Sequence, residues 1–112
     1  MTIKRGEVWL ANLDPTIGSE IRKTRPVVIV SNNINNVNNN VVSVLPITSN
    51  TERVFSFEVL LSKGIANLPK DSKAKADQIR TLDKIRLIKL IGKLPDVQML
   101  EIAAAIKLHL DL

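Results

Sequence analysis

The 112-residue sequence has no cysteine and a single histidine, His109. Without thiols the chain has neither a disulfide framework nor a cysteine nucleophile. Protein sites for zinc or copper need clustered nitrogen and sulfur ligands, which this composition cannot supply, and the acidic residues are too scattered for a carboxylate cage. A mechanism with two catalytic histidines is excluded, and for His109, in the helix near the chain end, a solvated or helix-terminus role is favoured over catalysis. The sequence predicts no metal site and no cofactor.

Glycines and long apolar runs are also scarce. The four glycines form neither GxxxxGK[ST] nor GxGxxG, so nucleotide-dependent chemistry is not indicated. The longest apolar stretches, around 26–30 and 103–106, fall far short of the about 18–20 residues of a membrane span. Charge returns by Glu7, so no signal-peptide hydrophobic region is predicted. We expect one cytoplasmic domain over 1–112 with no membrane association.

Positive charge is what the chain has in excess, with 16 Lys and Arg against 11 Asp and Glu. This balance suits a polyanion such as nucleic acid, or an acidic protein. On composition alone, a solubilising surface charge is an equal alternative. The basic residues gather in 22–25 and again in 70–93. A basic surface for a phosphate backbone or an acidic protein tail is expected at Lys73, Lys75, Lys84 and Lys89.

Apolar periodicity predicts a mainly β (α+β) chain that ends in one helix. Val8 and Trp9 are expected in the core, and so are Phe55 and Phe57. Many short strands followed by a helix imply a compact, barrel-like sheet with the helix packed on it. The expected strands are 7–11, 26–31 (buried on both faces), 41–47, 55–60 and, with weaker patterns, 72–81 and 88–94.

Two loops and the helix complete this interpretation. The loop over 14–24 is longer than a hairpin needs, and long loops are often functional. Residues 32–40 contain seven asparagines and are interpreted as a loop that can hold one helical turn, without a binding role. The helix begins at Pro95. Its predicted apolar stripe is Val97, Leu100, Ala104 and Leu108, with Met99, Ile102, Ala103 and Ile106 beside it.

The remaining inventory permits RNA cleavage without a metal, because RNA supplies its own nucleophile, the 2′-hydroxyl. The protein must position that oxygen, stabilise charge on the phosphate and help move protons. An arginine fork binds two phosphate oxygens and stays charged, and a threonine hydroxyl can hold another. Arg25 beside a strand start and Thr48 at a strand end are candidates, although most such residues serve surfaces and turns.

Several segments, taken in order, resemble one family. Arg5-Gly-Glu-Val-Trp9, Asp14-Pro15, Gly18-Ser19-Glu20 and Thr24-Arg-Pro-Val-Val-Ile-Val30 are similar to the N-terminal signature of the MazF/PemK toxins. Leu45-Pro-Ile-Thr48 resembles the next strand of that family, and 73–94 resembles its C-terminal half. Each motif is weak alone, but the ordered set covers nearly the whole chain and is specific.

The resemblance implies a CcdB/PemK-like, SH3-like small β-barrel with a C-terminal helix, acting as a homodimer. It implies a toxin that cuts single-stranded RNA sequence-selectively, leaving a 2′,3′-cyclic phosphate and a 5′-hydroxyl, and that a cognate antitoxin inhibits by laying its C-terminal tail across the RNA site. Arg25 and Thr48 match the family's catalytic positions, and Glu20 is the third candidate. The acceptor of the 2′ proton stays open between Glu20 and water. The expected RNA contacts lie in the 14–24 loop and beyond it: Gly18, Ser19, Lys23, Thr24, Gln78 and Arg80.

Other functions remain open. A toxin of the same fold that poisons a protein target such as a topoisomerase would cut no RNA, and the matched Arg25 and Thr48 favour the nuclease over it. A non-catalytic basic barrel would bind RNA and release it intact. A metal-dependent nuclease is disfavoured because the ligands are missing.

Overall fold

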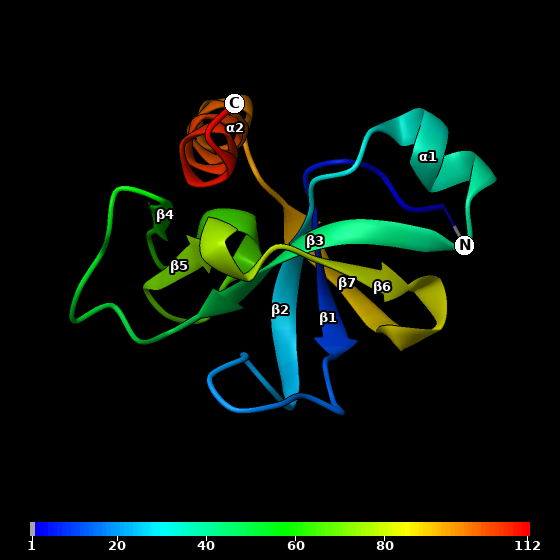
Figure 1. Cartoon of the computed structure of the whole chain (residues 1–112), viewed down its shortest axis with the longest axis horizontal. Coiled ribbons are helices and arrows are strands. Elements are labelled where there is room, and N and C mark those ends of the chain that lie inside the picture. Colours follow the sequence, from blue (N-terminus) through cyan, green and yellow to red (C-terminus); the bar gives the residue numbers. More distant parts are fainter. Residues whose placement is uncertain (1) are drawn as a thin grey trace.

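The computed structural model describes residues 2–112 and consists of a seven-stranded sheet with a C-terminal helix (Figure 1). The helices are α1 (Asn33–Asn38) and α2 (Asp96–Leu110), and the 3₁₀ turns are η1 (Ile65–Asn67), η2 (Ala76–Gln78) and η3 (Lys84–Arg86). The strands are β1 (Glu7–Asn12), β2 (Thr24–Ile29), β3 (Val41–Thr48), β4 (Glu58–Leu61), β5 (Ser72–Lys75), β6 (Arg80–Asp83) and β7 (Leu87–Lys93). Neither helix of the described chain is long and apolar enough to cross a bilayer.

The sheet is antiparallel and has the strand order β4-β5-β3-β2-β1-β7, with β6 also pairing with β3. β3 changes partner along its length: Val41–Val44 pair with β6, whereas Ile47 and Thr48 pair with β5. Pro46, which has no N–H to donate, lies where the partner changes. The sheet is barrel-like but is not closed, because β4 and β7 form its two ends. The predicted mainly β fold with a C-terminal helix is confirmed.

The core lies on both faces of the sheet. Val28 and Val30 face a cluster that includes Ile102 of α2, whereas Val27 and Ile29 face a second cluster that contains Trp9. All four valine and isoleucine side chains of this segment are buried, which confirms the prediction of a strand covered on both sides. The prediction that Trp9 is a core residue is also confirmed, and its indole N–H donates to Glu7 Oε1 at 3.2 Å.

The asparagine-rich segment forms the single helical turn that its sequence allowed. Asn32 caps α1, because its side chain accepts from Asn35 N–H at 2.8 Å. Asn36 is buried at 2% exposure and donates from Nδ2 to Ser31 O at 2.9 Å. These contacts give the asparagines a structural role.

Two strand predictions are wrong in their bounds. β4 begins at Glu58 rather than at 55, so Phe55 and Phe57 precede it; Phe55 is 44% exposed and neither ring joins the core. The predicted strand over 72–81 is broken by η2 into β5 and the start of β6. This break follows from the change of partner along β3, which pairs with both pieces.

The predicted apolar stripe of the C-terminal helix is not the face that packs on the sheet; Met99, Ile102 and Ile106, predicted beside it, contact the core. Val97, Leu100 and Leu108 of α2 are 62%, 72% and 56% exposed, whereas Ile102 and Ala105 are its buried residues. Apolar residues surround most of this helix, so its periodicity could not decide which face packs on the sheet. The helix itself is confirmed, and it begins directly after Pro95.

Position 92 in β7 requires glycine because the backbone of η1 passes close to it. A Cβ atom at Gly92 would lie 2.5 Å from the carbonyl oxygen of Ala66 in η1, and Asn67 Nδ2 ties this turn to Ile91 O at 2.9 Å. We therefore expect Gly92→Ala to lower the free energy of unfolding by about 1–3 kcal/mol, because η1 must move away. Urea unfolding measures this, with Lys93→Ala at the neighbouring exposed position as the control. Wild-type stability of Gly92→Ala would contradict the close approach.

Candidate active site

Arg25 and Thr48 lie at the same end of two neighbouring strands. β2 pairs with β3 so that Val27 faces Pro46 and Val28 faces Leu45. The pairing ends at Val27 and Pro46; continued by two residues, the same register would set Arg25 opposite Thr48 on one face of the sheet. A hollow of about 210 Å³ is lined by Arg25 together with the two neighbours of Thr48 in the chain, Ile47 and Ser49. Arg25 and Thr48 thus lie at the same end of β2 and β3, and their catalytic roles stay a prediction.

The local contacts leave both side chains able to bind an anion. Arg25 is half-buried, and its Nε donates to the carbonyl of Arg22 at 3.3 Å. Within residues 2–112 no carboxylate forms an ion pair with it. Thr48 Oγ1 accepts from Asn50 N–H at 3.3 Å, which orients the hydroxyl and leaves its proton available to a ligand.

A second hollow, of about 330 Å³, lies between the β1–β2 loop (13–23) and η2. Four of the predicted site residues meet there: Ser19 and Glu20 from the loop, and Gln78 and Arg80 from the opposite wall. Asp77, which sequence reasoning did not select, lines the same hollow. The other predicted residues, Gly18, Lys23 and Thr24, are exposed, and the first two have positive φ angles of 58° and 69°.

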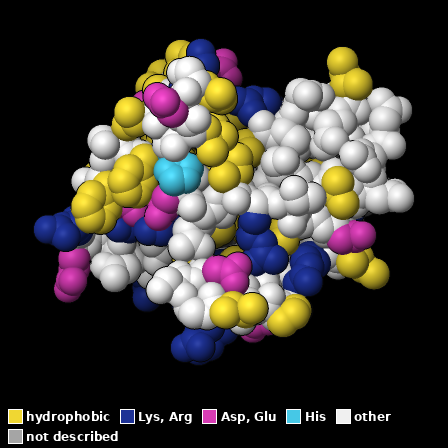
Figure 2. Space-filling view, viewed as in Figure 1, with side chains coloured by type: hydrophobic (Ala, Val, Ile, Leu, Met, Phe, Trp, Pro, Cys, Tyr) yellow, Lys and Arg dark blue, Asp and Glu magenta, His cyan; other side chains and the backbone are white. Residues whose placement is uncertain are grey.

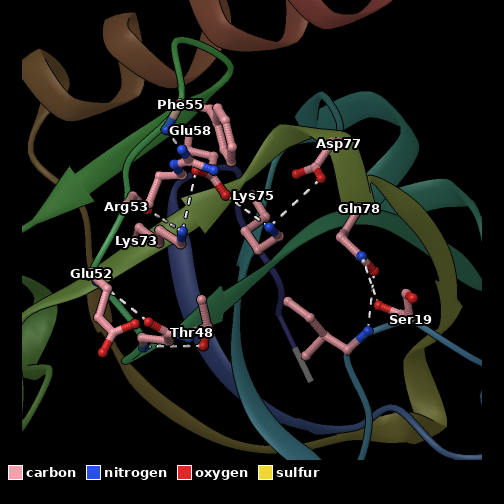
Figure 3. Close-up of polar contacts among 12 residues, drawn as sticks. Ser19, Thr48, Glu52, Arg53, Phe55, Glu58, Lys73, Lys75, Asp77 and Gln78 are labelled. Atoms are coloured by element: carbon pink, nitrogen blue, oxygen red, sulfur yellow. Dashed lines mark hydrogen bonds and ion pairs between the residues drawn. The ribbon is translucent and has the colours of Figure 1, made fainter.

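Gln78 and Arg80 hold the β1–β2 loop in place. Gln78 Nε2 donates to Ser19 O at 3.2 Å, while its Oε1 accepts from Ile21 N–H at 3.1 Å (Figure 3). Arg80 Nη1 donates to Leu13 O at 3.1 Å at the start of the loop. The structure thus gives both residues positioning contacts, and their direct contact with RNA stays a prediction.

Glu20 is engaged within its own loop. Its Oε1 accepts from Ile17 N–H at 2.7 Å, and its N–H donates to Ile17 O at 3.2 Å. The carboxylate is exposed, so it remains open to solvent and to ligands. In the part of the chain that the structure describes, no three His, Cys, Asp or Glu side chains gather as metal ligands do. The role of Glu20 as proton acceptor stays a prediction.

Sequence reasoning missed Glu58, whose side chain is completely buried beside the site. Glu58 Oε1 accepts from Phe55 N–H at 2.7 Å and from Lys73 Nζ at 3.2 Å, and Oε2 accepts from Lys75 Nζ at 2.7 Å (Figure 3). Lys75 Nζ also lies 3.6 Å from Asp77 Oδ2. Because Lys73 is the strand partner of Thr48 and Asp77 lines the hollow under the loop, these ion pairs connect the end of β3 with that hollow.

Burial and the neighbouring charges set the pKa of the Glu58 carboxyl. Burial raises the pKa of its carboxyl, but the hydrogen bonds from Lys75, from Phe55 N–H and from Lys73, with the attraction of Lys75, lower the pKa below its usual value. The expectation that Lys73 belongs to a basic surface is wrong, because Lys73 is 7% exposed. Lys75 and Lys84 are half-buried, and Lys89 is exposed. The missing signal was strand pairing: Glu58 faces Lys75 across β4 and β5, which one sequence does not reveal.

The two hydrogen bonds of Gln78 predict a local effect on the loop. In Gln78→Ala both are lost, at about 1 kcal/mol each, so we expect the Ile21 amide to exchange its hydrogen about 10- to 30-fold faster. Hydrogen exchange followed by NMR measures this. Thr81→Ala, an exposed change on the adjacent strand, is the control. Unchanged protection of Ile21 would contradict the positioning role.

Comparison with known proteins agrees with this arrangement. Residues 4–110 match the family model described as a PemK-like, MazF-like toxin of type II toxin-antitoxin systems. The chain belongs to the MazF/PemK family. The resemblance found in the sequence motifs is therefore confirmed across nearly the whole chain.

Individual members of the MazF/PemK family are similar over their full lengths. The chain is 42% identical over 115 residues to Endoribonuclease MazF9 of Mycobacterium tuberculosis (strain ATCC 25618 / H37Rv), covering 98% of each protein. It is 40% identical over 111 residues to Endoribonuclease MazF of Staphylococcus saprophyticus subsp. saprophyticus, covering 98% of this chain and 92% of that protein. A solved endoribonuclease from a mycobacterial species, in complex with its cognate antitoxin, superimposes with a TM-score of 0.82 at 26% identity, covering 98% and 96%.

Proposed function

We propose that this MazF-family toxin is a metal-independent endoribonuclease that cuts single-stranded RNA at a selected short sequence. Membership of the family and two relatives that are both called endoribonucleases make the chain a toxin endoribonuclease of a toxin–antitoxin system. The observation that carries the finer proposal is that Arg25 and Thr48 lie at the same end of neighbouring strands, and that the guanidinium of Arg25 has no acidic partner in the described chain. A guanidinium without a carboxylate partner suits a phosphate group.

The proposed reaction uses the hydroxyl of the substrate. The RNA 2′-oxygen attacks the neighbouring phosphorus, the bond from phosphorus to the 5′-oxygen breaks, and the products are a 2′,3′-cyclic phosphate and a 5′-hydroxyl. Arg25 neutralises the charge that develops on the phosphate, and Thr48 orients one of its oxygens. Arginine holds its proton too firmly to act as a base. The 2′ proton therefore passes to Glu20 or to water, and the departing 5′-oxygen takes up a proton.

The partners follow from the same proposal. Single-stranded RNA approaches over the β1–β2 loop, where Gly18, Ser19, Lys23, Thr24, Gln78 and Arg80 provide the contacts. We assign a homodimer, a cytoplasmic location and inhibition by a cognate antitoxin that covers the RNA path. The mycobacterial relative in complex with its antitoxin supports this last assignment. Because RNA is a polyanion, we expect its binding to weaken steeply with added salt.

Incubation of the purified protein with a long, unstructured RNA in EDTA tests the proposal. We expect cuts at a repeated short sequence, cyclic-phosphate ends, and no loss of activity caused by EDTA. Mapping the fragment ends also identifies the recognised sequence. RNA that stays intact and unbound with a folded sample would favour the toxin that poisons a protein target. RNA that is bound but intact would favour the non-catalytic binding module.

A further inference from the structure

Four side chains near the site form a stack on the surface. The rings of Phe55 and Phe57 are parallel within 7°, with centroids 5.3 Å apart. Arg53 Cζ lies 5.1 Å from the centroid of Phe55, and the ring of His109 in α2 packs against Phe57 at a tilt of 49°, with centroids 5.9 Å apart. We call these four residues the aromatic stack. Figure 2 shows apolar side chains beside the chain's one histidine, at the surface of the molecule.

The backbone beneath the aromatic stack is held by buried charges. Phe55 N–H donates to the buried carboxylate of Glu58 at 2.7 Å, and Lys73 Nζ donates to the carbonyl of Arg53. The carbonyl of Phe57 accepts from Ala76 N–H at 3.3 Å. The stack is therefore presented by a fixed backbone, so little conformational entropy is lost when a ligand contacts it.

The aromatic stack also lies close to the proposed site of cleavage. Thr48 begins the segment that leads to Arg53, and its strand partner Lys73 is the residue whose Nζ binds the Arg53 carbonyl. In Figure 3, Lys73 lies between Thr48 and the pair Arg53 and Phe55. A strand of RNA whose scissile phosphate lies at Thr48 can therefore continue onto Phe55.

We propose that the aromatic stack is a subsite on which an unpaired RNA base next to the cleavage site stacks, an inference that rests on the proposed function. Every base has a flat π-face, and aromatic rings and guanidinium groups are the surfaces on which unpaired bases stack. Phe55 is 44% exposed, and the guanidinium of the exposed Arg53 lies over its ring. The incoming base displaces this guanidinium or stacks on its outer side. Because every base offers a flat face, the subsite adds affinity without selecting sequence.

The test uses Phe55→Leu, which keeps apolar bulk and removes the flat ring, and Phe55→Trp, which enlarges it. The probe is an RNA that carries a 2′-deoxy nucleotide at the cleavage position. Its short form ends at the cut, and its long form extends beyond the cut on both sides. We expect Phe55→Leu to raise the Kd of the long form about 5- to 150-fold and to leave the short form unchanged. Phe55→Trp binds as well as the wild type or better. Ile85→Ala, at an apolar position 88% exposed in η3, is the control and should change the Kd of neither RNA form.

Two results would overturn the subsite. One is an equal Kd of Phe55→Leu and wild type for the long RNA. The other is a loss of antitoxin binding in Phe55→Leu with RNA binding intact, which would assign the stack to the protein partner. Failure of the proposed function is recognised separately, because the wild type would then leave the all-ribose form of the same RNA uncut, whatever the affinities of the variants.

Discussion

We expect Arg25→Ala to abolish RNA cutting and to leave the chain folded. Arg25 is half-buried at the end of β2, and the hydrogen bond of its side chain goes to the carbonyl of Arg22, so its removal opens no core cavity. Loss of a group that stabilises charge in the transition state costs at least about 10²- to 10³-fold in rate. Single-turnover cleavage measures the loss, and thermal unfolding verifies the fold.

Two further variants make this result specific to the guanidinium of Arg25. Arg25→Lys keeps the charge but loses the planar fork that binds two phosphate oxygens, so we expect most of the activity to be lost as well. Arg22→Ala removes a nearby exposed charge and keeps the carbonyl that Arg25 Nε binds, so it should cut normally. A near-normal rate for Arg25→Ala would contradict the assignment of the site.

We expect Glu58→Gln to destabilise the chain by about 3–5 kcal/mol, the cost of breaking a buried ion pair by removing one partner. Lys73, which is 7% exposed, would lose its carboxylate partner, and Lys75 would keep only the more distant Asp77. Urea unfolding measures the change. Glu52→Gln, an exposed position in the segment before β4, is the matched control and should be neutral. Equal effects of the two substitutions would show that the buried cluster contributes no specific stability.

The pH dependence of stability should also reflect the ion pairs of Glu58. The pKa of Glu58 in the folded chain lies below its usual value, so the carboxylate form favours folding. This contribution is complete above the unfolded pKa and is lost as the pH falls through the lower folded pKa. We therefore expect the wild type to lose stability more steeply than Glu58→Gln as the pH drops below the usual range of glutamate. Parallel pH profiles of the two proteins would contradict the lowered pKa.

Much of the fold could be predicted because short-range patterns decide it. The continuous β-branched run that forms β2 required cover on both faces, and Trp9 lies in a short apolar run, Val8-Trp-Leu-Ala11, that is typical of a core strand. The face of α2 could not be predicted, since apolar residues surround the helix and only packing against the sheet selects Ile102 and Ala105. Phe55 was assigned to the core from the alternating pattern over 55–60, although β4 starts after it.

The candidate site, like the fold, could be predicted from the sequence only in part. Arg25 and Thr48 were selected by motif, and the pairing of β2 with β3 then sets them at the same end of the two strands. The partners of Glu58 depend on the pairing of β4 with β5, and the sequence contains no local sign of this pairing. Contacts of Gln78 with the β1–β2 loop join residues more than fifty positions apart, so they too needed the folded chain.

The most direct test of metal-independent cleavage through the RNA 2′-hydroxyl is a single-atom change in the substrate. Once the cut position is mapped, the same RNA is prepared with a 2′-deoxy nucleotide immediately before the scissile phosphate and incubated with the wild-type protein in EDTA. We predict that the all-ribose RNA is cut and that the substituted RNA is bound but stays intact. Cutting of the substituted RNA at the same phosphate would contradict the account, because another nucleophile would then carry out the reaction.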